Sequence, residues 1–384
     1  MEHLINPHVK EIEISGIRQF YNMVSDIDDV LSFTIGLPDF PTPLHIKDKA
    51  INAIQKDCTT YTHNAGLLDL RQEVSKFMYS HYSLKYNPDD EILITVGASQ
   101  AIDIAFRTIL TPGDEVILPG PVYPGYEPLI HLAGGKAVHV DTRSTSFKLT
   151  PQLITESLTE KTKCIVLPYP SNPTGVSLTR EELEEIADLV RGKNIFILAD
   201  EIYSELTLDR THTSIGSIIR EQTITINGLS KSHSMTGWRI GFLMAPKAII
   251  KHMIKVHQYN VSCASSVSQM AALEAMRNGE HDPAAMREEY KNRRDYVFNR
   301  LAAMNLQTVL PDGAFYFFIK IPDAFKNSLD FALKLVQFEK VAVIPGSAFS
   351  KYGEGYFRLS YAVSMEQLKE GLNRLEHFLI QQIK

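Results

Sequence analysis

Residues 228–241 read GLSKSHSMTGWRIG. Lys231 lies there among small and hydroxyl residues, and Arg239 follows eight positions later, next to the only tryptophan of the chain. A lysine amine that is partly deprotonated forms Schiff bases with carbonyl compounds, and small neighbours give a bulky aldehyde access to it. The planar guanidinium of Arg239 suits a phosphate group. The alternative is a surface lysine and a salt-bridged arginine, the more common role of such residues.

Short apolar runs around this stretch have the composition of β-strands. We expect strands at 91–96, 115–119, 136–140, 163–168, 194–199, 223–227 and 242–245. Helical patterns lie between most of them, at 46–56, 67–80, 99–110, 124–133, 151–158 and 180–190. Strands rich in Val, Ile and Leu that alternate with helix-length segments predict a mainly parallel sheet with helices on both faces.

The pattern changes after about residue 247. There we expect helices at 247–278 and 283–304, short strands at 315–320, 341–345 and 356–360, and a final helix from about 365 to 382. This order is typical of a second, smaller α+β unit, against which we expect the N-terminal segment to pack. We therefore expect a large domain at 46–284 and a small domain built from 1–45 and 285–384.

Composition narrows the class of protein. The 384 residues include 39 Lys and Arg against 45 Asp and Glu, and the resulting net charge of −6 disfavours nucleic-acid binding. The three cysteines are far apart and odd in number, so we expect no disulfide framework. There is no secretory signal and no apolar run of the ~20 residues that cross a bilayer. We expect a cytoplasmic soluble protein without a membrane partner.

Several common motifs are absent from the sequence. It has no GxGxxG, no GxxxxGK(S/T), no GxSxG and no HExxH. The 13 histidines are scattered without metal-ligand spacing, so we expect no metal site.

Two strand ends carry polar groups. ILADEIY (197–203) ends a strand at Asp200, where open α/β sheets bind ligands, and this carboxylate could hold a cationic heteroaromatic nitrogen or cap the next element. In TVGASQAID (95–103) a strand runs through Gly97-Ala98-Ser99 into a helix. The free N–H groups there suit an anion, although a serine-capped turn gives the same pattern.

Three further stretches add candidates. Asn172, in the loop PYPSNPTG, could donate its amide to a ligand or form a rigid turn. Tyr123, in GPVYPGY, could stack on a planar ligand or pack in the core. Arg358, in GEGYFRLSYA, lies between apolar residues and needs an anionic partner, because unpaired burial costs several kcal/mol. That partner is either a ligand or a structural carboxylate.

Together and in this order, the motifs resemble those of the class I/II aminotransferases, which are pyridoxal-phosphate enzymes of fold type I. The resemblance runs from GLPDFPTP near residue 36 to FRLSYA near residue 360. It implies an α/β fold in which a large domain has a mainly parallel seven-stranded sheet flanked by helices. It also implies a smaller α+β domain and a homodimer with shared active sites.

The resemblance implies roles for the residues around the cofactor. Lys231 is expected to carry pyridoxal 5′-phosphate covalently and to move a proton on the substrate. Asp200 is expected to pair with the pyridine nitrogen and keep the ring cationic. Tyr203 and Asn172 match the residues that bond the 3-oxygen, and Tyr123 matches the stacking ring.

The phosphate site implied by the resemblance consists of Ala98, Ser99 and Arg239. Tyr61, in YTHNAG, resembles the tyrosine that reaches the phosphate of the neighbouring subunit. One position departs from the family pattern, because many relatives carry a phosphate-binding serine where this chain has Gly228. That contact is either missing or made by Ser230.

The substrate α-carboxylate is expected to be bound by Arg358, Asn172 and the backbone at Gly36. Some relatives read a distal acid with an arginine from the partner subunit, but this chain has no arginine between Arg239 and Arg277. Arg18, in SGIRQF, is the candidate for that role.

The implied reaction is a ping-pong transfer of an amino group between an L-amino acid and a 2-oxo acid. The wider sequence, including KVHQYNVSCASS, is similar to N-acetyl-L,L-diaminopimelate aminotransferases of lysine biosynthesis, with 2-oxoglutarate as the second substrate. The alternatives are a broad-specificity aromatic or aspartate-type aminotransferase, a C–S β-lyase on the same cofactor, and a non-enzymatic anion-binding module. A transcriptional regulator is disfavoured, because GLPDF begins at residue 36 and leaves no room for a DNA-binding domain.

Overall fold

The computed structural model describes residues 1–382. Its main sheet has seven strands in the order β2-β8-β7-β6-β5-β3-β4. They are β2 (Ile92–Thr95), β3 (Glu115–Gly120), β4 (Lys136–Asp141), β5 (Thr162–Leu167), β6 (Phe196–Asp200), β7 (Thr223–Gly228) and β8 (Gly241–Met244). Strand β8 is antiparallel to both of its neighbours and the other pairs are parallel, which confirms the predicted mainly parallel sheet.

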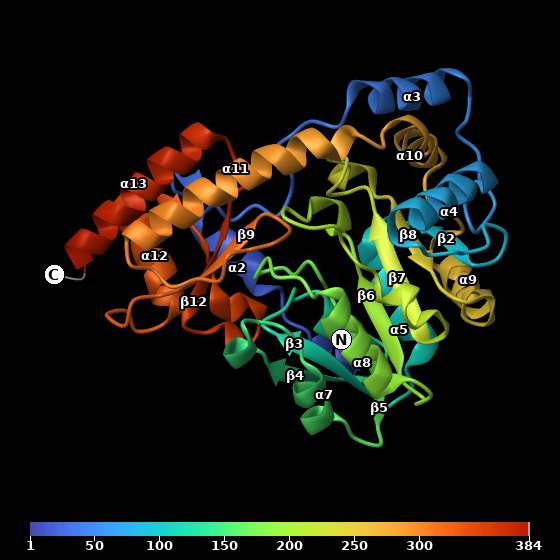
Figure 1. Cartoon of the computed structure of the whole chain (residues 1–384), viewed down its shortest axis with the longest axis horizontal. Coiled ribbons are helices and arrows are strands. Elements are labelled where there is room, and N and C mark those ends of the chain that lie inside the picture. The colour runs from blue at the N-terminus through green and yellow to red at the C-terminus, as the bar shows by residue number, and fades with distance from the viewer. Residues whose placement is uncertain (383–384) are drawn as a thin grey trace.

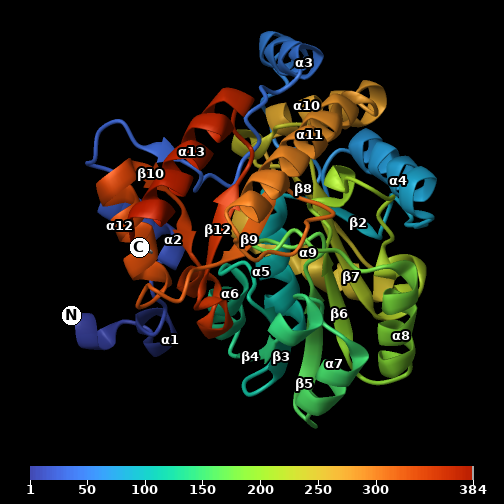
Figure 2. The same cartoon turned by 60° about the vertical axis from the view of Figure 1, so that its left-hand side comes forward.

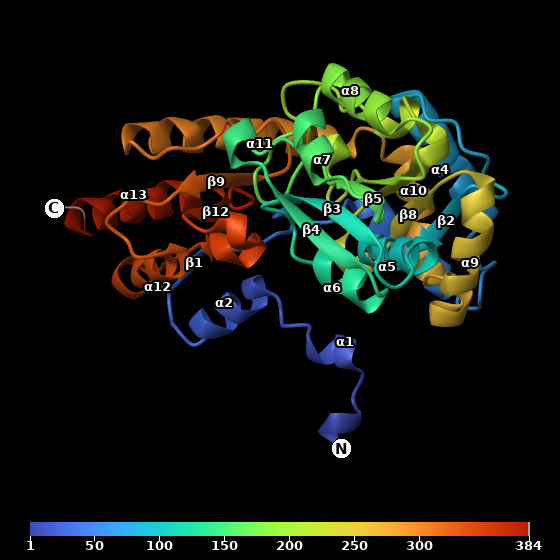
Figure 3. The same ribbon diagram turned by 90° about the horizontal axis from the view of Figure 1, so that it is seen from below.

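Helices cover both faces of this sheet. They are α3 (Leu44–Gln55), α4 (Leu68–Tyr82), α5 (Gly97–Ile109), α6 (Tyr126–Leu132), α7 (Pro151–Ser157), α8 (Arg180–Val190), α9 (Lys247–Val261) and α10 (Ser266–Asn278). Successive side chains of a strand point to opposite faces. Accordingly, Leu93 belongs to an apolar cluster that contains residues of α5, α6 and α9, whereas Ile92 and Ile94 belong to one that contains residues of α3, α4 and α10. Figure 3 shows α7 and α8 on one side of the sheet and α5 and α6 on the other.

The C-terminal part forms a second layer. It contains α11 (Asp282–Ala303), β9 (Tyr316–Lys320), α12 (Ser328–Glu339), β10 (Val341–Ala342), β11 (Ile344–Pro345), β12 (Tyr356–Ser360) and α13 (Met365–Gln382). Strands β11, β12 and β9 make an antiparallel sheet. Figure 1 shows α11 running from the main sheet to this second part.

The N-terminal segment joins the C-terminal part. It consists of η1 (Glu2–Leu4), α1 (Pro7–Lys10), α2 (Gly16–Val24) and β1 (Leu31–Ser32). Strand β1 pairs in parallel with β10, and α2 contacts β11, as expected from the sequence. Figure 2 shows α2 close to α12. We propose the division into a domain at 46–284 and one built from 1–45 and 285–384, with the second boundary inside the first turn of α11.

After residue 247, the structure differs from the sequence expectation at three places. The helix expected at 247–278 is two helices, because Ser262 has a φ of 64° and Ser265 caps a new helix. The strand expected at 341–345 divides into β10 and β11, which belong to different sheets. Helix α12 was not expected, although Asn327 caps its first turn by accepting a hydrogen bond from the amide of Asp330.

Short 3₁₀ turns complete the chain, at η2 (Arg143–Thr145), η3 (Ser204–Leu206), η4 (Ile215–Ser217), η5 (Arg220–Gln222), η6 (Thr236–Trp238), η7 (Gly346–Phe349) and η8 (Lys351–Gly353). Cys58, Cys164 and Cys263 are free thiols. Within residues 1–382, no helix has the length and apolar character needed to cross a membrane.

Candidate active site

A cavity of about 360 Å³ lies beyond the carboxyl ends of β3, β5 and β6, between the two parts of the molecule. Ligands bind at this edge in open α/β sheets. The cavity brings together most of the residues singled out in the sequence, namely Gly36, Ala98, Ser99, Tyr123, Asn172, Asp200, Tyr203, Ser230, Lys231, Arg239 and Arg358.

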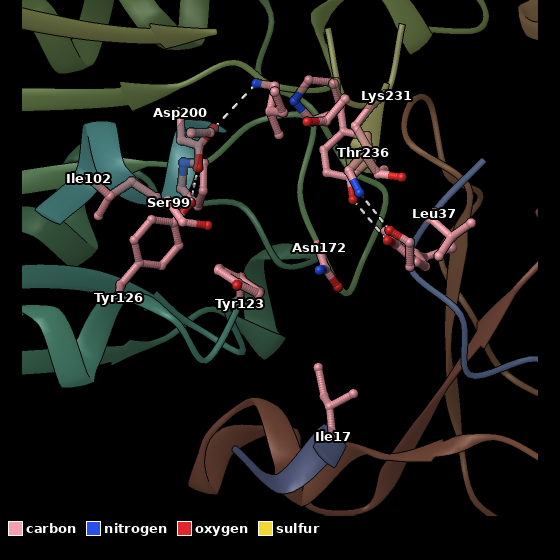
Figure 4. Close-up of a pocket in the computed structure, with 18 of the residues that line it drawn as sticks. Ile17, Leu37, Ser99, Ile102, Tyr123, Tyr126, Asn172, Asp200, Lys231 and Thr236 are labelled. Carbon is pink, nitrogen blue, oxygen red and sulfur yellow. Dashed lines mark hydrogen bonds between the residues drawn. The ribbon is translucent and has the colours of Figure 1, made fainter. Parts of the chain in front are cut away.

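Lys231 enters the cavity from the turn that follows β7. Its Nζ donates a hydrogen bond of 2.5 Å to the carbonyl oxygen of Gly36. The pKa of Lys231 is lowered to about 8 by burial and by the positive charges of Arg358 and Arg239. The negative charge of Asp200 offsets this effect only in part. A lysine in this state supplies a neutral amine near physiological pH, unlike an ordinary surface lysine. Figure 4 shows Ile17 of α2 across the cavity from Lys231.

Asp200 is the last residue of β6 and is only 7% exposed. Its Oδ2 accepts a hydrogen bond of 2.6 Å from the hydroxyl of Tyr126, and its Oδ1 accepts one of 3.3 Å from the amide of Ile202. Asp200 therefore does not cap the next helical element, because η3 begins after Tyr203 without a side-chain cap, and its side chain lines the cavity instead (Figure 4). Burial raises the pKa of this carboxyl, so a cationic partner would restore its ionised form.

Arg239 and the first turn of α5 form a region of the cavity with positive electrostatic character. Gly97 begins α5 with a φ of +76°, and a Cβ there would lie 2.4 Å from Nη2 of Arg239. The guanidinium therefore lies against the helix N-terminus, and its Nη1 donates a hydrogen bond of 2.8 Å to the carbonyl of Thr236. Free helix N–H groups beside an arginine make a site suited to a phosphate. Ser99 belongs to the same first turn.

Arg358, in β12, is only 2% exposed. Its Nη1 donates a hydrogen bond of 2.9 Å to Oδ1 of Asn172, and its Nη2 donates one of 2.6 Å to the carbonyl of Thr34. The guanidinium lies over the rings of Tyr316 and Phe349, with its Cζ 4.5 Å and 5.0 Å from their centroids.

No carboxylate among residues 1–382 pairs with Arg358, and its Nε has no hydrogen-bond partner. Burial also lowers the pKa of this guanidinium. The structural ion pair considered in the sequence is therefore not formed. A buried cation of this kind is stabilised when an anionic ligand enters the cavity.

Two tyrosines of the site were missed in the sequence. Tyr126 holds Asp200, and Tyr316 makes a hydroxyl–hydroxyl contact of 2.8 Å with Tyr203 as well as supporting Arg358. Tyr126 closes the motif GPVYPGY, in which only Tyr123 was considered. For Tyr316, the sequence indicates only a position in the strand expected at 315–320. Their partners are distant in sequence, so only the fold identifies these contacts.

The aromatic wall beside Asp200 depends on a glycine. The rings of Tyr123 and Tyr126 meet edge to face, with centroids 5.7 Å apart. A Cβ at Gly125 would lie 2.3 Å from the ring of Tyr123, so a larger residue there would displace this ring. Tyr123 is thus held as one wall of the cavity, where a planar ligand can stack on it.

Three residues discussed in the sequence lie outside the cavity. Tyr61 is 86% exposed. Arg18 is exposed and lines an adjoining cavity of about 350 Å³, which shares Gly36 with the first. Gly228 is not on the wall, since a Cβ there would face the backbone of Ile240 at 3.0 Å, whereas Ser230 does line the cavity.

Comparison with known proteins identifies similar sequences over the whole length. A model of the family described as Aminotransferase class I and II matches residues 28–375. A curated protein of Bacillus subtilis (strain 168), the probable N-acetyl-LL-diaminopimelate aminotransferase, is 62% identical over 380 residues, which are 99% of this chain and 97% of that protein. Aromatic-amino-acid aminotransferase 2 of Thermococcus litoralis is 40% identical over 381 residues, 98% of each protein.

The fold is also similar to that of solved structures. The aspartate aminotransferase from Thermus thermophilus with maleate superposes with a TM-score of 0.94 at 34% identity, covering 98% of this chain and 99% of that one. The aromatic aminotransferase from Pyrococcus horikoshii OT3 has a TM-score of 0.90 at 40% identity, covering 95% and 99%.

Proposed function

This chain belongs to the class I and II aminotransferases, and we infer that it exchanges an amino group between N-acetyl-L,L-diaminopimelate and 2-oxoglutarate in lysine biosynthesis. As an aminotransferase, it acts on amino and oxo acids. The choice of substrate is supported by the 62% identity to the Bacillus subtilis protein over nearly the full length of both.

Members of this family use pyridoxal 5′-phosphate, and the cavity has groups that fit each part of it. Arg239 and the N-terminus of α5 suit the phosphate. The buried carboxylate of Asp200 suits a cationic ring nitrogen, and the amine of Lys231 suits the aldehyde. We propose that Ala98, Ser99 and Ser230 add phosphate contacts, that Tyr123 stacks on the ring, and that Tyr203 and Asn172 bond its 3-oxygen.

The proposed mechanism assigns proton transfer to Lys231. When bound, the cofactor supplies a cationic ring that accepts the electron pair left on the substrate Cα after its proton is removed. Lys231 is suited to take that proton, because its pKa of about 8 leaves part of its amine neutral at physiological pH. Asp200 stabilises the positive charge of the ring nitrogen, and Tyr126 fixes the orientation of its carboxylate.

Arg358 is proposed to bind the substrate α-carboxylate. Its two Nη atoms are oriented by Asn172 and Thr34, and the unpartnered Nε leaves capacity for an anion. The observation that carries the proposed function is this buried guanidinium, without a carboxylate partner in residues 1–382, in the same cavity as Lys231. It lets a substrate be held by its carboxylate while its amino-bearing carbon faces a base.

Two proposed contacts lie outside the main cavity. The adjoining cavity lined by Arg18 provides space and a positive charge for the distal part of a substrate. Tyr61, which is exposed in the single chain, is proposed to reach the phosphate of a second subunit in a homodimer. Sedimentation of the holoenzyme would test the dimer, and a weaker cofactor affinity of Tyr61→Phe would test the contact.

A panel of amino donors and oxo acids tests the substrate assignment. With 2-oxoglutarate as acceptor, N-acetyl-L,L-diaminopimelate is expected to give a higher kcat/KM than aspartate, phenylalanine or tyrosine. Fast turnover of the last three without activity on the first would replace the proposal with a broad-specificity aminotransferase. Thiol release from cystathionine without formation of glutamate would instead indicate a C–S β-lyase.

A further inference from the structure

Three potential metal ligands meet at the surface, away from the active-site cavity. They are His8 on α1, Glu11 just after it, and His131 in the last turn of α6. One ligand atom from each lies within 4.8 Å of the others. We propose that His8, Glu11 and His131 bind a zinc ion. This ion would link the N-terminal arm, residues 1–15, to helix α6.

The donor set suits zinc. Two imidazole nitrogens and one carboxylate oxygen are ligands that Zn²⁺ accepts, with water in the fourth position. Tetrahedral bonds of about 2.0–2.1 Å place ligand atoms roughly 3.3 Å apart. Nε2 of His131 and Oε2 of Glu11 are now 2.5 Å apart, and the other separations extend to at most 4.8 Å. Small rotations of these surface side chains would therefore create the required geometry.

Local structure directs the ligands toward one point. The side chain of Asn6 caps α1 by accepting a hydrogen bond from the amide of His8. His8 and Glu11 are three positions apart and so project from the same side of this turn. His131 lies at the C-terminal end of α6, where the helix dipole favours a cation. The rings of His8 and His131 already meet edge to face, with centroids 5.4 Å apart.

The charges nearby favour a cation as well. Glu127 lies one turn before His131 on α6 and bonds to His139, so a second acidic side chain stands one helical turn from this ligand. Zinc binds neutral imidazole and ionised carboxylate groups, so it would compete with protons for these ligands. Binding is therefore expected to weaken as the pH falls and these ligands become protonated.

The third ligand explains why no metal spacing was visible in the sequence. His131 is 120 positions from Glu11, so the set exists only after folding. The chain also contains an ordinary pair of similar geometry, His377 and Glu339, whose atoms are 2.7 Å apart. Within residues 1–382, that pair has no third ligand atom within the same 4.8 Å limit, which makes it a matched control.

A zinc ion at this position would restrain the N-terminal arm. Figure 3 shows η1 and α1 projecting from the body beside α6, which α1 contacts. The arm continues into α2, whose Ile17 lines the active-site cavity. A metal bond between the arm and α6 would therefore restrain the segment that leads to the cavity mouth.

Calorimetric titration with zinc chloride tests the site directly. The sample is tag-free holoenzyme that has been treated with a chelator and dialysed. One zinc ion per chain is expected, and His8→Ala, Glu11→Gln and His131→Ala should each weaken binding about tenfold or more. His377→Ala should bind zinc as the wild type does. Equal affinity in all five proteins, or a loss only in His377→Ala, would overturn the proposal.

Limited proteolysis provides a second, independent measurement. Zinc is expected to slow cleavage within the N-terminal arm of the wild type but not of His131→Ala, while His377→Ala behaves as the wild type. Zinc binding with no change in cleavage of the arm would reject the tether. Protection that persists in His131→Ala would show that the ion binds elsewhere.

Discussion

The guanidinium of Arg239 lies so close to Gly97 that a Cβ atom there would come within 2.4 Å of Nη2. Gly97→Ala is therefore expected to displace Arg239 and to weaken cofactor binding about tenfold or more, the usual effect of losing a charged hydrogen bond. Absorbance titration of the apoenzyme with pyridoxal 5′-phosphate measures this affinity.

Gly192→Ala is the control for this substitution. Gly192 has the same φ of +76°, but no atom lies within 4 Å of the position that an added methyl group would take, so the change strains the backbone without touching the site. Equal cofactor affinities of the two variants would contradict the role given to Arg239.

The lowered pKa of Lys231 predicts how the apoenzyme takes up its cofactor. Only the neutral amine attacks an aldehyde, and with a pKa of about 8 roughly one tenth of it is neutral at pH 7. The rate of incorporation should therefore rise about tenfold per pH unit below pH 8 and level off above it. Stopped-flow absorbance from pH 6 to pH 10 measures the profile. A rate that continues to rise through pH 10 would indicate an ordinary lysine.

Tyr126 is expected to act through Asp200. Its hydrogen bond favours the ionised carboxylate, so Tyr126→Phe should raise the pKa of Asp200 further and weaken its hold on the ring nitrogen. We expect kcat to fall about tenfold, and to fall further as the pH is lowered because the carboxylate is protonated more readily. Tyr169→Phe, at a buried tyrosine that binds the amide of Leu149, is the control. Parallel pH profiles for the two variants would reject the role.

Arg358 should affect substrate binding more than the chemical step. Arg358→Lys keeps the charge but loses the planar group held by Asn172 and Thr34, so KM for the amino donor should rise about tenfold or more with a smaller change in kcat. Steady-state kinetics of both half-reactions measure the two parameters. Arg293→Lys, at a buried arginine paired with Asp39, should leave KM unchanged. A fall in kcat alone would contradict carboxylate binding by Arg358.

The sequence predicted the layers of the fold well, because most strands of the main sheet are short runs rich in Val, Ile and Leu. It predicted the limits of the elements after residue 247 less well. The division at Ser262 depends on a single left-handed residue inside a continuous helical pattern. Helix α12 lies between two short strands, and its start depends on the capping side chain of Asn327.

The candidate site could be predicted where a motif is local and not where a contact is long-range. Asp200, Lys231 and Arg239 follow strands or turns in recognisable stretches, and the structure brings them into one cavity. The contacts of Tyr126 with Asp200 and of Tyr316 with Arg358 join residues on different elements, so no local pattern indicates them. The roles proposed for these side chains remain predictions for the experiments above.

Turnover by Lys231→Ala is the most direct test of the account. Lys231→Ala and Lys251→Ala, at an exposed lysine of α9, are compared with the wild type in the transfer of the amino group from N-acetyl-L,L-diaminopimelate to 2-oxoglutarate, which forms glutamate, with cofactor in excess. Loss of turnover by about a thousandfold or more in Lys231→Ala alone is the predicted result. Wild-type turnover by Lys231→Ala would contradict the assignment of this lysine as the catalytic base.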